Sequence, residues 1–578
     1  MNKRFLLSGV LVLAFAMCKD PLAVVNQNDP DRNRVFTNPA DLQVFTAGLF
    51  AVMHQSTIGG SNDGLQTQMI VMGMENTSTL ANFAMGPRGS IPRNPITNQR
   101  GSQGNAGNYH DWFRGHRAAR QAALALASLK NITLGTAAAD ARARAFARLV
   151  QGIALGNLSL AYDSASIMTE NDNPEADAAV VVPLSSYQVV NTAALGYLDS
   201  AIAIATANPG SFPLPATANF WINGVTVSQA LFIQIARSYK ARLRANVART
   251  PTERAAVDWA LVIADANAGI TVDLAPQMDP TNGWDVSWVV QHFTTGAGAW
   301  HQMSQFWMGM ADTSGGYAAW LATTPATSRS SFLVVTPDRR FPGGANCVSP
   351  CSAAARTAQG AAAGTASAGQ PFANTPYFRN RPSGEDVSGD PLQISMYDFW
   401  RSRQFRQANR IGPYPIMTAA EIRLLAAEGY IRTNNFPAAI TRINVSRAGS
   451  DTGVTAAGKG GLRPIPLTVA DTVTRIPGTA VNCVPKVPDP AQSYRGTKCG
   501  NMWDALKWEY RMETAYTGYG MWFFAARGWG DLPENTAYQW PVPFQEMDAR
   551  RKSFYGFGGG GPSSAAAGNY GLFPGGVY

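Results

Sequence analysis

The amino-acid sequence predicts a mainly α-helical protein, in which helical hairpins form a scaffold joined by long loops and minor β-hairpins. Six segments carry apolar or alanine residues at helical spacing, with few β-branched alternations, which is typical of amphipathic helices. They are 39–54, 109–130, 140–163, 186–207, 226–248 and 253–268. The chain has 578 residues, of which 46% are apolar, so it can bury a sizeable core around these helices.

A helical hairpin is clearest over residues 417–449. Small and apolar residues at helical spacing mark a first helix, Thr433-Asn434-Asn435 predicts a turn, and a second helix follows. Its length and small-residue contacts resemble one tetratricopeptide hairpin, whose paired helices need neighbours to bury their faces. We therefore expect a helical solenoid, in which 140–163 pairs with 186–207 and 226–248 pairs with 253–268.

Long connections separate the predicted helices. The stretches 82–108 and 271–317 are rich in Asn, Gly and Pro, and 352–374 is a low-complexity stretch of Ala, Gly, Ser and Thr. Loops of this length within a compact body are usually either functional or disordered.

The first residues have the layout of an export signal. Lys3 and Arg4 precede an apolar stretch that ends at Met17, which is shorter than the roughly 20 residues of a spanning helix. Cys18 follows at once, as in a bacterial lipoprotein signal whose cysteine is acylated. We expect a signal peptide at 1–17 and a polar tether at 18–33, with a plain secreted protein as the alternative.

Charge and cysteine content narrow the function classes. Lys and Arg total 47 against 38 Asp and Glu, and the basic residues are scattered, so nucleic acid is not an expected partner. The other four cysteines suggest disulfides in an exported chain. Three pairings are possible, and we favour Cys347 with Cys351 and Cys483 with Cys499 over a zinc site.

Several motifs together resemble the RagB/SusD family of outer-membrane nutrient-uptake lipoproteins. "CKDPLAVVNQNDP" looks like its lipid-bearing cysteine and tether, and "YHDWFRGHRAARQAA" is similar to its first core helix. "AAEIRLLAAEGYIRTNNFPAAITRINVSRAG" resembles its signature hairpin. "WDALKWEYRMETAYTGYGMWFF" and "YQWPVPFQEMDAR" resemble its late helix and its near-terminal signature.

The resemblance implies a SusD-like α-α superhelix over 34–578. The helical scaffold would comprise 34–270 and 415–550, and 271–414 would form a loop-rich, ligand-facing insert. It also implies an outer-membrane, cell-surface lipoprotein that captures oligosaccharides and delivers them to a SusC-like TonB-dependent transporter. Some members of the family are associated with peptides instead, so a peptide ligand stays open.

Enzyme motifs are not found. The histidines form no H-E-x-x-H, there is no G-x-S-x-G, and the glycine-rich near-matches fail on context. We therefore expect no catalytic residues, no metal and no cofactor. The rival class is a lipid-anchored glycoside hydrolase using paired carboxylates, for which Glu509 and Glu513 share a helix face, although we favour a structural role for both.

Sugar recognition needs aromatic faces beside polar groups. The stretch 282–320 combines both, and from it we select Trp284, Trp288, Trp300 and Tyr317 as ligand-binding candidates. Trp284 and Trp300 are preferred, because turn-forming residues or glycines flank them, whereas Trp307 and Trp320 could continue a helix into the core. The polar loop 82–108 adds Asn82, Arg88 and Asn94.

Overall fold

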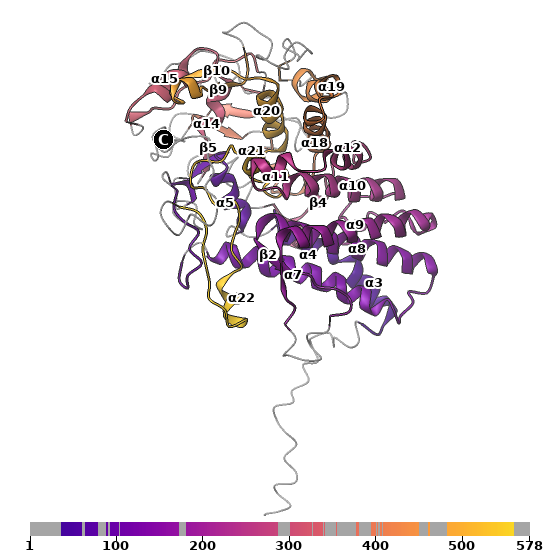
Figure 1. Cartoon of the computed structure of the whole chain (residues 1–578). Helices are drawn as coiled ribbons and strands as arrows, with labels where there is room; N and C mark the ends of the chain where they lie inside the picture. The colour runs from indigo at the N-terminus through magenta and orange to yellow at the C-terminus, as the bar shows by residue number, and fades with distance from the viewer. Residues whose placement is uncertain are drawn as a thin grey trace, which may run out of the picture.

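The computed structural model shows a helical stack with a loop-rich region at its side (Figure 1). The described residues are 36–559, except 60–63, 79–87, 91–92, 103–104, 173–180, 287–300, 326–327, 339, 342–353, 355–376, 381–394, 400, 403–404, 407, 450–460 and 463–482. The predicted signal peptide and tether therefore lie outside the described residues.

Helices provide most of the regular structure. In the first half of the chain they are α3 (Pro39–Ala47), α4 (Leu49–Gln55), α5 (Leu65–Met72), α7 (Asn105–Ser128), α8 (Ala137–Ala161), α9 (Tyr187–Ala207), α10 (Gln229–Asn246), α11 (Pro251–Ala255) and α12 (Trp259–Asn267). Later come α14 (Gln305–Met308), α15 (Gly316–Ala322), α18 (Ala419–Arg432), α19 (Phe436–Ala448), α20 (Met502–Thr514), α21 (Met521–Trp529) and α22 (Phe544–Ala549).

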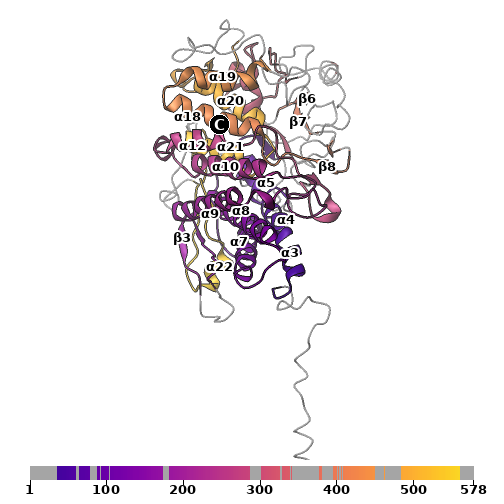
Figure 2. The same cartoon turned by 90° about the vertical axis from the view of Figure 1, so that its right-hand side faces the viewer.

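The scaffold is a sequence of neighbouring antiparallel pairs. Helix α7 contacts α8, α8 contacts α9, and α9 contacts α10, which contacts α12; α12 then contacts the hairpin α18–α19. Figures 1 and 2 show these helices layered from α7 near one end of the molecule to α19 at the other. The predicted hairpins, including the turn at Thr433-Asn434-Asn435, are present.

Glycines set the close spacing within this stack. A Cβ atom at Gly152 of α8 would lie 2.8 Å from Cγ of Leu198 on α9, and one at Gly156 would lie 2.5 Å from Cδ1 of Leu243 on α10. Real Cβ atoms do not approach neighbours so closely, so a side chain at either position would push the helices apart. The two glycines therefore allow α8 to pack against both neighbours.

Two predicted helices are each divided in two. The segment 39–54 breaks at Gly48, a residue type that lowers helix stability. The segment 253–268 breaks before Asp258, whose carboxylate accepts a hydrogen bond from the backbone N–H of Leu261 at 3.1 Å and so caps a new helix. Capping chemistry thus overrides the continuous apolar spacing at that point.

Helix α9 is long and apolar enough to span a membrane by length and composition alone. It packs against α8 and α10, however, and its face from Val190 to Ala205 is buried in the main core. We therefore interpret α9 as a core helix of the stack.

The strands form five two-stranded antiparallel sheets among the described residues. They pair β1 (Asn76–Ser78) with β5 (His301–Met303), β2 (Ser164–Ser166) with β3 (Leu184–Ser186), β4 (Gln277–Met278) with β8 (Gly412–Pro413), β6 (Phe378–Asn380) with β7 (Tyr397–Phe399), and β9 (Lys486–Pro488) with β10 (Thr497–Cys499). Of these described pairs, only β9–β10 is a short hairpin. The β1–β5 and β4–β8 pairs instead join distant segments, which apolar alternation within one segment does not predict.

Two large hydrophobic clusters meet at α20. The larger follows the helical stack and includes Leu506 and Tyr510, whereas the second includes Trp508 and Met512. Many residues of the second cluster come from 303–399. Helix α20 therefore forms a wall common to both clusters.

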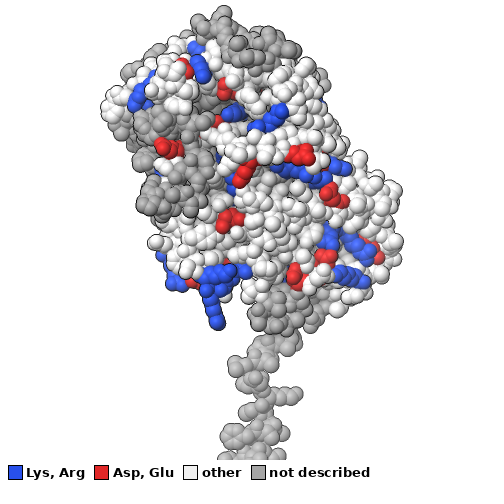
Figure 3. All heavy atoms as spheres, in the orientation of Figure 1, with Lys and Arg blue, Asp and Glu red and all other residues white. Residues whose placement is uncertain are grey.

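Charges of both signs are interspersed over most of the face shown in Figure 3. Lys and Arg side chains gather more densely at the lower left of that view, where Figure 1 places α22. On this face, cations are therefore denser at the α22 end than the scattered charge of the sequence predicts.

Candidate functional site

Trp284, one of the two preferred ligand-binding rings, is a core residue. Its side chain is 0% exposed and stacks on Phe50, with ring centroids 6.1 Å apart, and on His54 at 5.3 Å. The backbone turns tightly here, because Asp279 and Trp284 form a β-bridge around Gly283, whose φ of 78° suits glycine. The turn directs the ring inward, so the prediction that Trp284 binds ligand is wrong.

Arg88, predicted to bind ligand, is also buried. Its Nε donates to Oε1 of Gln68 at 3.1 Å, and its Nη1 donates to the backbone oxygen of Pro95 at 3.2 Å. Burial, assisted by nearby Arg93, lowers the pKa of Arg88 to about 10. The guanidinium thus joins Gln68 to Pro95 inside the protein and is not available to a ligand.

Apart from Tyr317, only one of the remaining predicted ligand-binding residues belongs to the described part of the chain. Asn94 is exposed. Asn82, Trp288 and Trp300 lie outside the described residues, as do Cys18 and the predicted pair Cys347 and Cys351.

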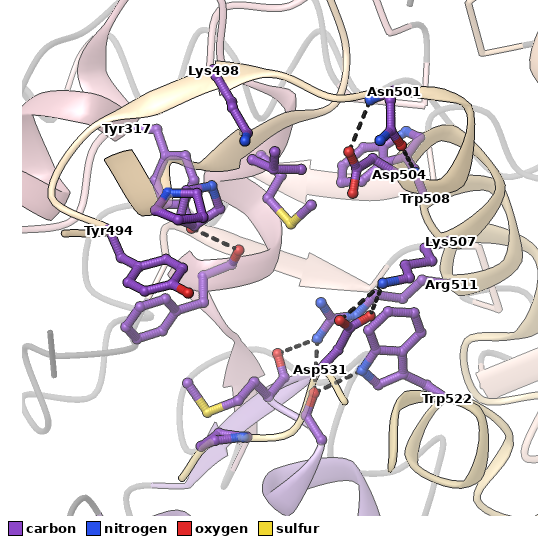
Figure 4. A pocket seen from close by; sticks show the side chains of 18 residues that line it. Tyr317, Tyr494, Lys498, Asn501, Asp504, Lys507, Trp508, Arg511, Trp522 and Asp531 are labelled. Atoms are coloured by element: carbon purple, nitrogen blue, oxygen red, sulfur yellow. Dashed lines mark hydrogen bonds and ion pairs between the residues drawn. The ribbon is translucent and has the colours of Figure 1, made fainter. Parts of the chain in front are cut away.

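Tyr317 is the candidate that leads to a site. It lines a pocket of about 350 Å³ between α14, α15, α20, α21 and the β9–β10 hairpin (Figure 4). Five aromatic rings line this pocket, together with two methionines, three prolines and a group of charged or polar side chains. The rings are those of Phe306, Tyr317, Tyr494, Trp508 and Trp522, and the polar residues are Lys498, Asn501, Asp504, Lys507, Arg511 and Asp531.

One wall of the pocket is the hairpin β9–β10. A disulfide joins Cys483 to Cys499, the pairing that we predicted, and closes this hairpin at its base. At its tip, Asp489 accepts hydrogen bonds from the backbone N–H of Ala491 at 3.1 Å and from Nε2 of Gln492 at 3.0 Å. Both ends of the hairpin are therefore fixed, one covalently and the other by a carboxylate.

Tyr494 projects from this fixed hairpin. Both Ser493 (φ 50°) and Tyr494 (φ 60°) adopt the left-handed conformation, which costs free energy for residues other than glycine. The Tyr494 N–H donates to the backbone oxygen of Asp489 at 2.9 Å, which holds the conformation in place. The backbone is thus strained at Tyr494, and the half-buried ring of this residue lines the pocket.

The opposite wall comes from α20 and the segment after α21. Asn501 and Asp504 cap α20 reciprocally, and Lys507 forms an ion pair with Asp531 at 2.7 Å. Trp508 donates its Nε1–H to Oδ2 of Asp338 at 3.2 Å. Figure 4 shows Tyr317 and Tyr494 on one side of the pocket and Lys507 and Trp522 on the other.

Arg511 lies at the base of the pocket between two tryptophans. Its Cζ is 4.6 Å from the ring centroid of Trp307 and 4.3 Å from that of Trp522, and Nη2 donates to the backbone oxygens of Gly73 and Met74. Burial lowers the pKa of Arg511 to about 10. Burial also raises the pKa of the nearby Glu75 to about 7. Arg511 therefore holds pocket walls from distant parts of the chain in place.

The two carboxylates of the hydrolase alternative have structural roles. Glu509 accepts hydrogen bonds from Arg340, with Nη1 to Oε2 at 2.6 Å, and is 0% exposed. Glu513 accepts from Nη2 of Arg401 at 3.0 Å and from the hydroxyl of Tyr377 at 3.1 Å. Because both acids are engaged inside the core, they do not form a pair open to substrate.

Sequence reasoning did not select the hairpin residues of the pocket. The stretch "VPDPAQSYRGTKC" ends at one of the predicted disulfide cysteines, and no ligand-binding residue is predicted in it. A usable signal was present, however, because an aromatic residue among turn-forming Asp, Pro, Ser and Gly residues between two cysteines is held at the surface of a fixed loop.

Comparisons with known proteins identify the fold. No family model matches the sequence, and no curated protein sequence is similar to it. A SusD superfamily protein from Bacteroides thetaiotaomicron VPI-5482 has a similar structure, with a TM-score of 0.51, 12% identity and coverage of 89% of this chain and 97% of that one. A SusD homolog from Bacteroides uniformis ATCC 8492 gives a TM-score of 0.51 at 14% identity, covering 91% and 98%. The resemblance predicted from the sequence is thus confirmed at the level of the fold.

Proposed function

We propose that this chain, which has the fold of the SusD superfamily, is a nutrient-binding protein that captures an oligosaccharide without chemically altering it. The observation that carries the proposal is the pocket in which the Tyr494 ring lies on a fixed hairpin beside polar side chains. Sugar rings present apolar C–H faces to aromatic rings and hydroxyls to polar groups, so a sugar site combines both features.

The dimensions and groups of the pocket support a small oligomer segment as ligand. A volume of about 350 Å³ falls within the roughly 300–1,000 Å³ of ligand sites in general. Tyr494 supplies a half-buried face for stacking. Lys498 is mostly exposed, with 53% of its side chain accessible, and it lies 3.7 Å from Asp489. Its ammonium group can therefore turn toward ligand hydroxyls at little cost.

The arrangement favours binding over catalysis. Asp504 and Asp531 line the pocket, but the first accepts from the backbone N–H of Asn501 at 2.8 Å and the second pairs with Lys507. Neither is placed as a free acid or base. The pocket therefore supplies contacts that select and hold a ligand.

The cellular role that we propose follows from the leader and the fold together. Cys18 would carry the lipid that anchors the protein to the outer membrane, with the folded body at the cell surface. The captured oligosaccharide would then pass to a SusC-like TonB-dependent transporter. A peptide ligand is the alternative within the same role.

A library experiment tests the proposal. The purified mature protein is incubated with glycan and peptide libraries, and both binding and turnover are measured. We expect glycans to bind without turnover and Tyr494→Ala to weaken that binding, while Tyr109→Ala, which removes an exposed ring of α7 that does not line the pocket, leaves it unchanged. Turnover at enzymatic rates would overturn the proposal, and binding of peptides alone would replace the ligand class.

A further inference from the structure

Cations and aromatic rings gather on a surface formed by α7, α22 and the segments 98–100 and 550–554, which we call the α22 surface. Its exposed members are Arg100, Arg117, Arg551, Lys552, Tyr109, Phe113 and Phe554. Figure 3 shows the blue side chains at this place.

Contacts among the described residues join these elements into one surface. Asn98 accepts hydrogen bonds from Nδ2 of Asn108 at the start of α7 and from the backbone N–H of Phe544 at the start of α22. The Cζ of Arg100 lies 5.9 Å from the ring centroid of Phe554. On α7, the rings of Tyr109 and Phe113 stack with centroids 5.7 Å apart, although 48% of Phe113 is exposed.

The surface has an excess of positive charge. Among the described residues, two carboxylates lie on this surface and both are engaged, since Asp548 pairs with Arg100 at 2.7 Å and Glu546 pairs with Arg550 at 2.7 Å. Arg117, Arg551 and Lys552 are exposed in addition. Arg551 ends α22 in the left-handed conformation, with φ of 55°, and the next N–H, that of Lys552, donates to the backbone oxygen of Met547 at 2.8 Å. This turn ends the helix at two adjacent exposed cations.

The position of the surface in the molecule agrees with a membrane contact. In Figures 1 and 2, α3, α7 and α22 lie at one end and α19 at the other. Phe36, the first described residue, shares a hollow with Ala127 and Ser128 at the far end of α7. Helix α7 has 24 residues, so it is about 36 Å long. The eighteen Cα–Cα steps from Cys18 to Phe36 span at most about 60 Å, which exceeds that length.

We infer that the α22 surface docks on a lipid bilayer whose headgroups are anionic. Exposed cations attract such headgroups, and exposed aromatic rings enter the interfacial region, so a surface that combines them fits a membrane better than a neutral partner. Docking would orient the anchored body, with the α22 end toward the bilayer. The α22 surface shares no residue with the ligand pocket, so membrane docking does not depend on what the pocket binds.

Vesicle sedimentation tests the inference. The full mature chain with Cys18→Ser, which cannot be acylated, is mixed with vesicles of phosphatidylcholine alone or of phosphatidylcholine with phosphatidylglycerol. We expect binding to the anionic vesicles only, weakened by added salt because screening shortens the range of charge attraction. Replacing Arg551 and Lys552 with Glu should weaken binding by on the order of 100-fold or more, since each basic residue near such a surface contributes about fivefold.

Matched variants identify the surface. Arg442→Glu changes a cation on α19, at the opposite end, and should leave vesicle binding unchanged. Phe113→Ala should weaken it several-fold at unchanged charge. Equal binding to both vesicle types, no binding to either, or an equal loss in Arg442→Glu would overturn the inference. Glycan binding by the same variants, measured in solution, reports separately on folding and on the pocket.

Discussion

Arg340 and Glu509 form an ion pair that is fully buried, with Nη1 of Arg340 2.6 Å from Oε2 of Glu509 and both side chains 0% exposed. Arg340 also binds Asp338 through Nε and Nη2, at 2.9 and 2.7 Å. The guanidinium therefore connects Asp338 to Glu509 on α20, the wall between the two hydrophobic clusters.

Replacing Arg340 with Met should lower the free energy of unfolding by about 3–5 kcal/mol, because two buried carboxylates, Asp338 and Glu509, would lose their nearest cation. Urea unfolding measures this change. Arg100→Met is the matched control, since Arg100 binds Asp548 with two hydrogen bonds at a site where its side chain is 67% exposed, and exposed pairs contribute roughly 0–1 kcal/mol. Similar losses in the two variants would contradict the structural role of the buried pair.

Tyr494 and Trp284 should respond oppositely to truncation. Tyr494→Ala removes a half-buried pocket ring, so ligand affinity should fall by roughly 1–3 kcal/mol while stability changes little. Trp284→Ala removes a ring packed between Phe50 and His54, so unfolding should become easier by about 3–5 kcal/mol with little change in affinity of the folded protein. Isothermal titration and thermal melts separate the two effects, and loss of fold in the Tyr494 variant would assign that ring to the core.

Removing the disulfide should affect the pocket as well as stability. Cys483 and Cys499 are 16 residues apart, and replacing both with Ser should lower the free energy of unfolding by about 2–4 kcal/mol. Ligand affinity should also fall, because Tyr494 is no longer held in its strained position. In that background Tyr494→Ala should cost less affinity than in the native protein. Full additivity of the two changes would show that the disulfide does not position the ring.

Acid should destabilise the fold through two buried histidines. Burial lowers the pKa of His54 and of His116 from 6.5 to about 4 in the folded protein. Between those values the unfolded chain takes up protons that the folded chain does not, so the free energy of unfolding falls as pH falls. Each histidine should contribute a loss of about 2 kcal/mol between pH 7 and pH 5. Glu75 has the opposite effect on the free energy of unfolding. Its pKa is raised to about 7 in the folded protein, so below that pH the folded chain binds a proton that the unfolded chain does not.

His116→Gln isolates one of these contributions. His116 accepts a hydrogen bond on Nε2 from the backbone N–H of Ser166 at 3.2 Å, so protonation at Nε2 would break that contact. The variant should lose stability less steeply than the native protein between pH 7 and pH 5. Denaturant titrations at both pH values measure this slope, and identical slopes would show that folding does not lower the pKa of His116.

Replacing Cys18 with Ser should release the protein from membranes. Acylation needs the thiol, and several acyl chains at about 0.8 kcal/mol per buried CH₂ hold a protein firmly. Fractionation after a salt and carbonate wash, which removes proteins held by charge alone, measures retention. Cys351→Ser is the control and should stay with the membrane. Retention of the Cys18 variant after that wash would contradict the lipid anchor.

The scaffold could be predicted from the sequence because its signals are local. Helical spacing marks α8, α9 and the α18–α19 hairpin, and the turn Thr433-Asn434-Asn435 has its own chemistry. The bounds of α11 and α12 differ from the prediction because a cap, that of Asp258, divides a continuous apolar pattern.

Most of the candidate site could not be predicted from the sequence, and the reason is physical. Its walls come from residues 73–74, 306–317 and 487–533, which only the folded chain brings together. Trp284 and Tyr317 have similar local sequences, rich in glycine, and both are buried, yet tertiary packing places only Tyr317 at the edge of the pocket. Composition can indicate that rings and polar groups are present, whereas their exposure depends on contacts between distant segments.

The disulfide-closed β9–β10 hairpin has a consequence for the evolution of this protein. Cys483 and Cys499 fix the base of the hairpin. The residues between them can therefore diverge without changing the packing of α8 against α9 and α10, which depends on Gly152 and Gly156. Changes in this one wall of the pocket can therefore occur with little effect on the packing of the helical stack. Evolution could thus alter one wall of the candidate site by changing a single short loop, while the helical architecture stays the same.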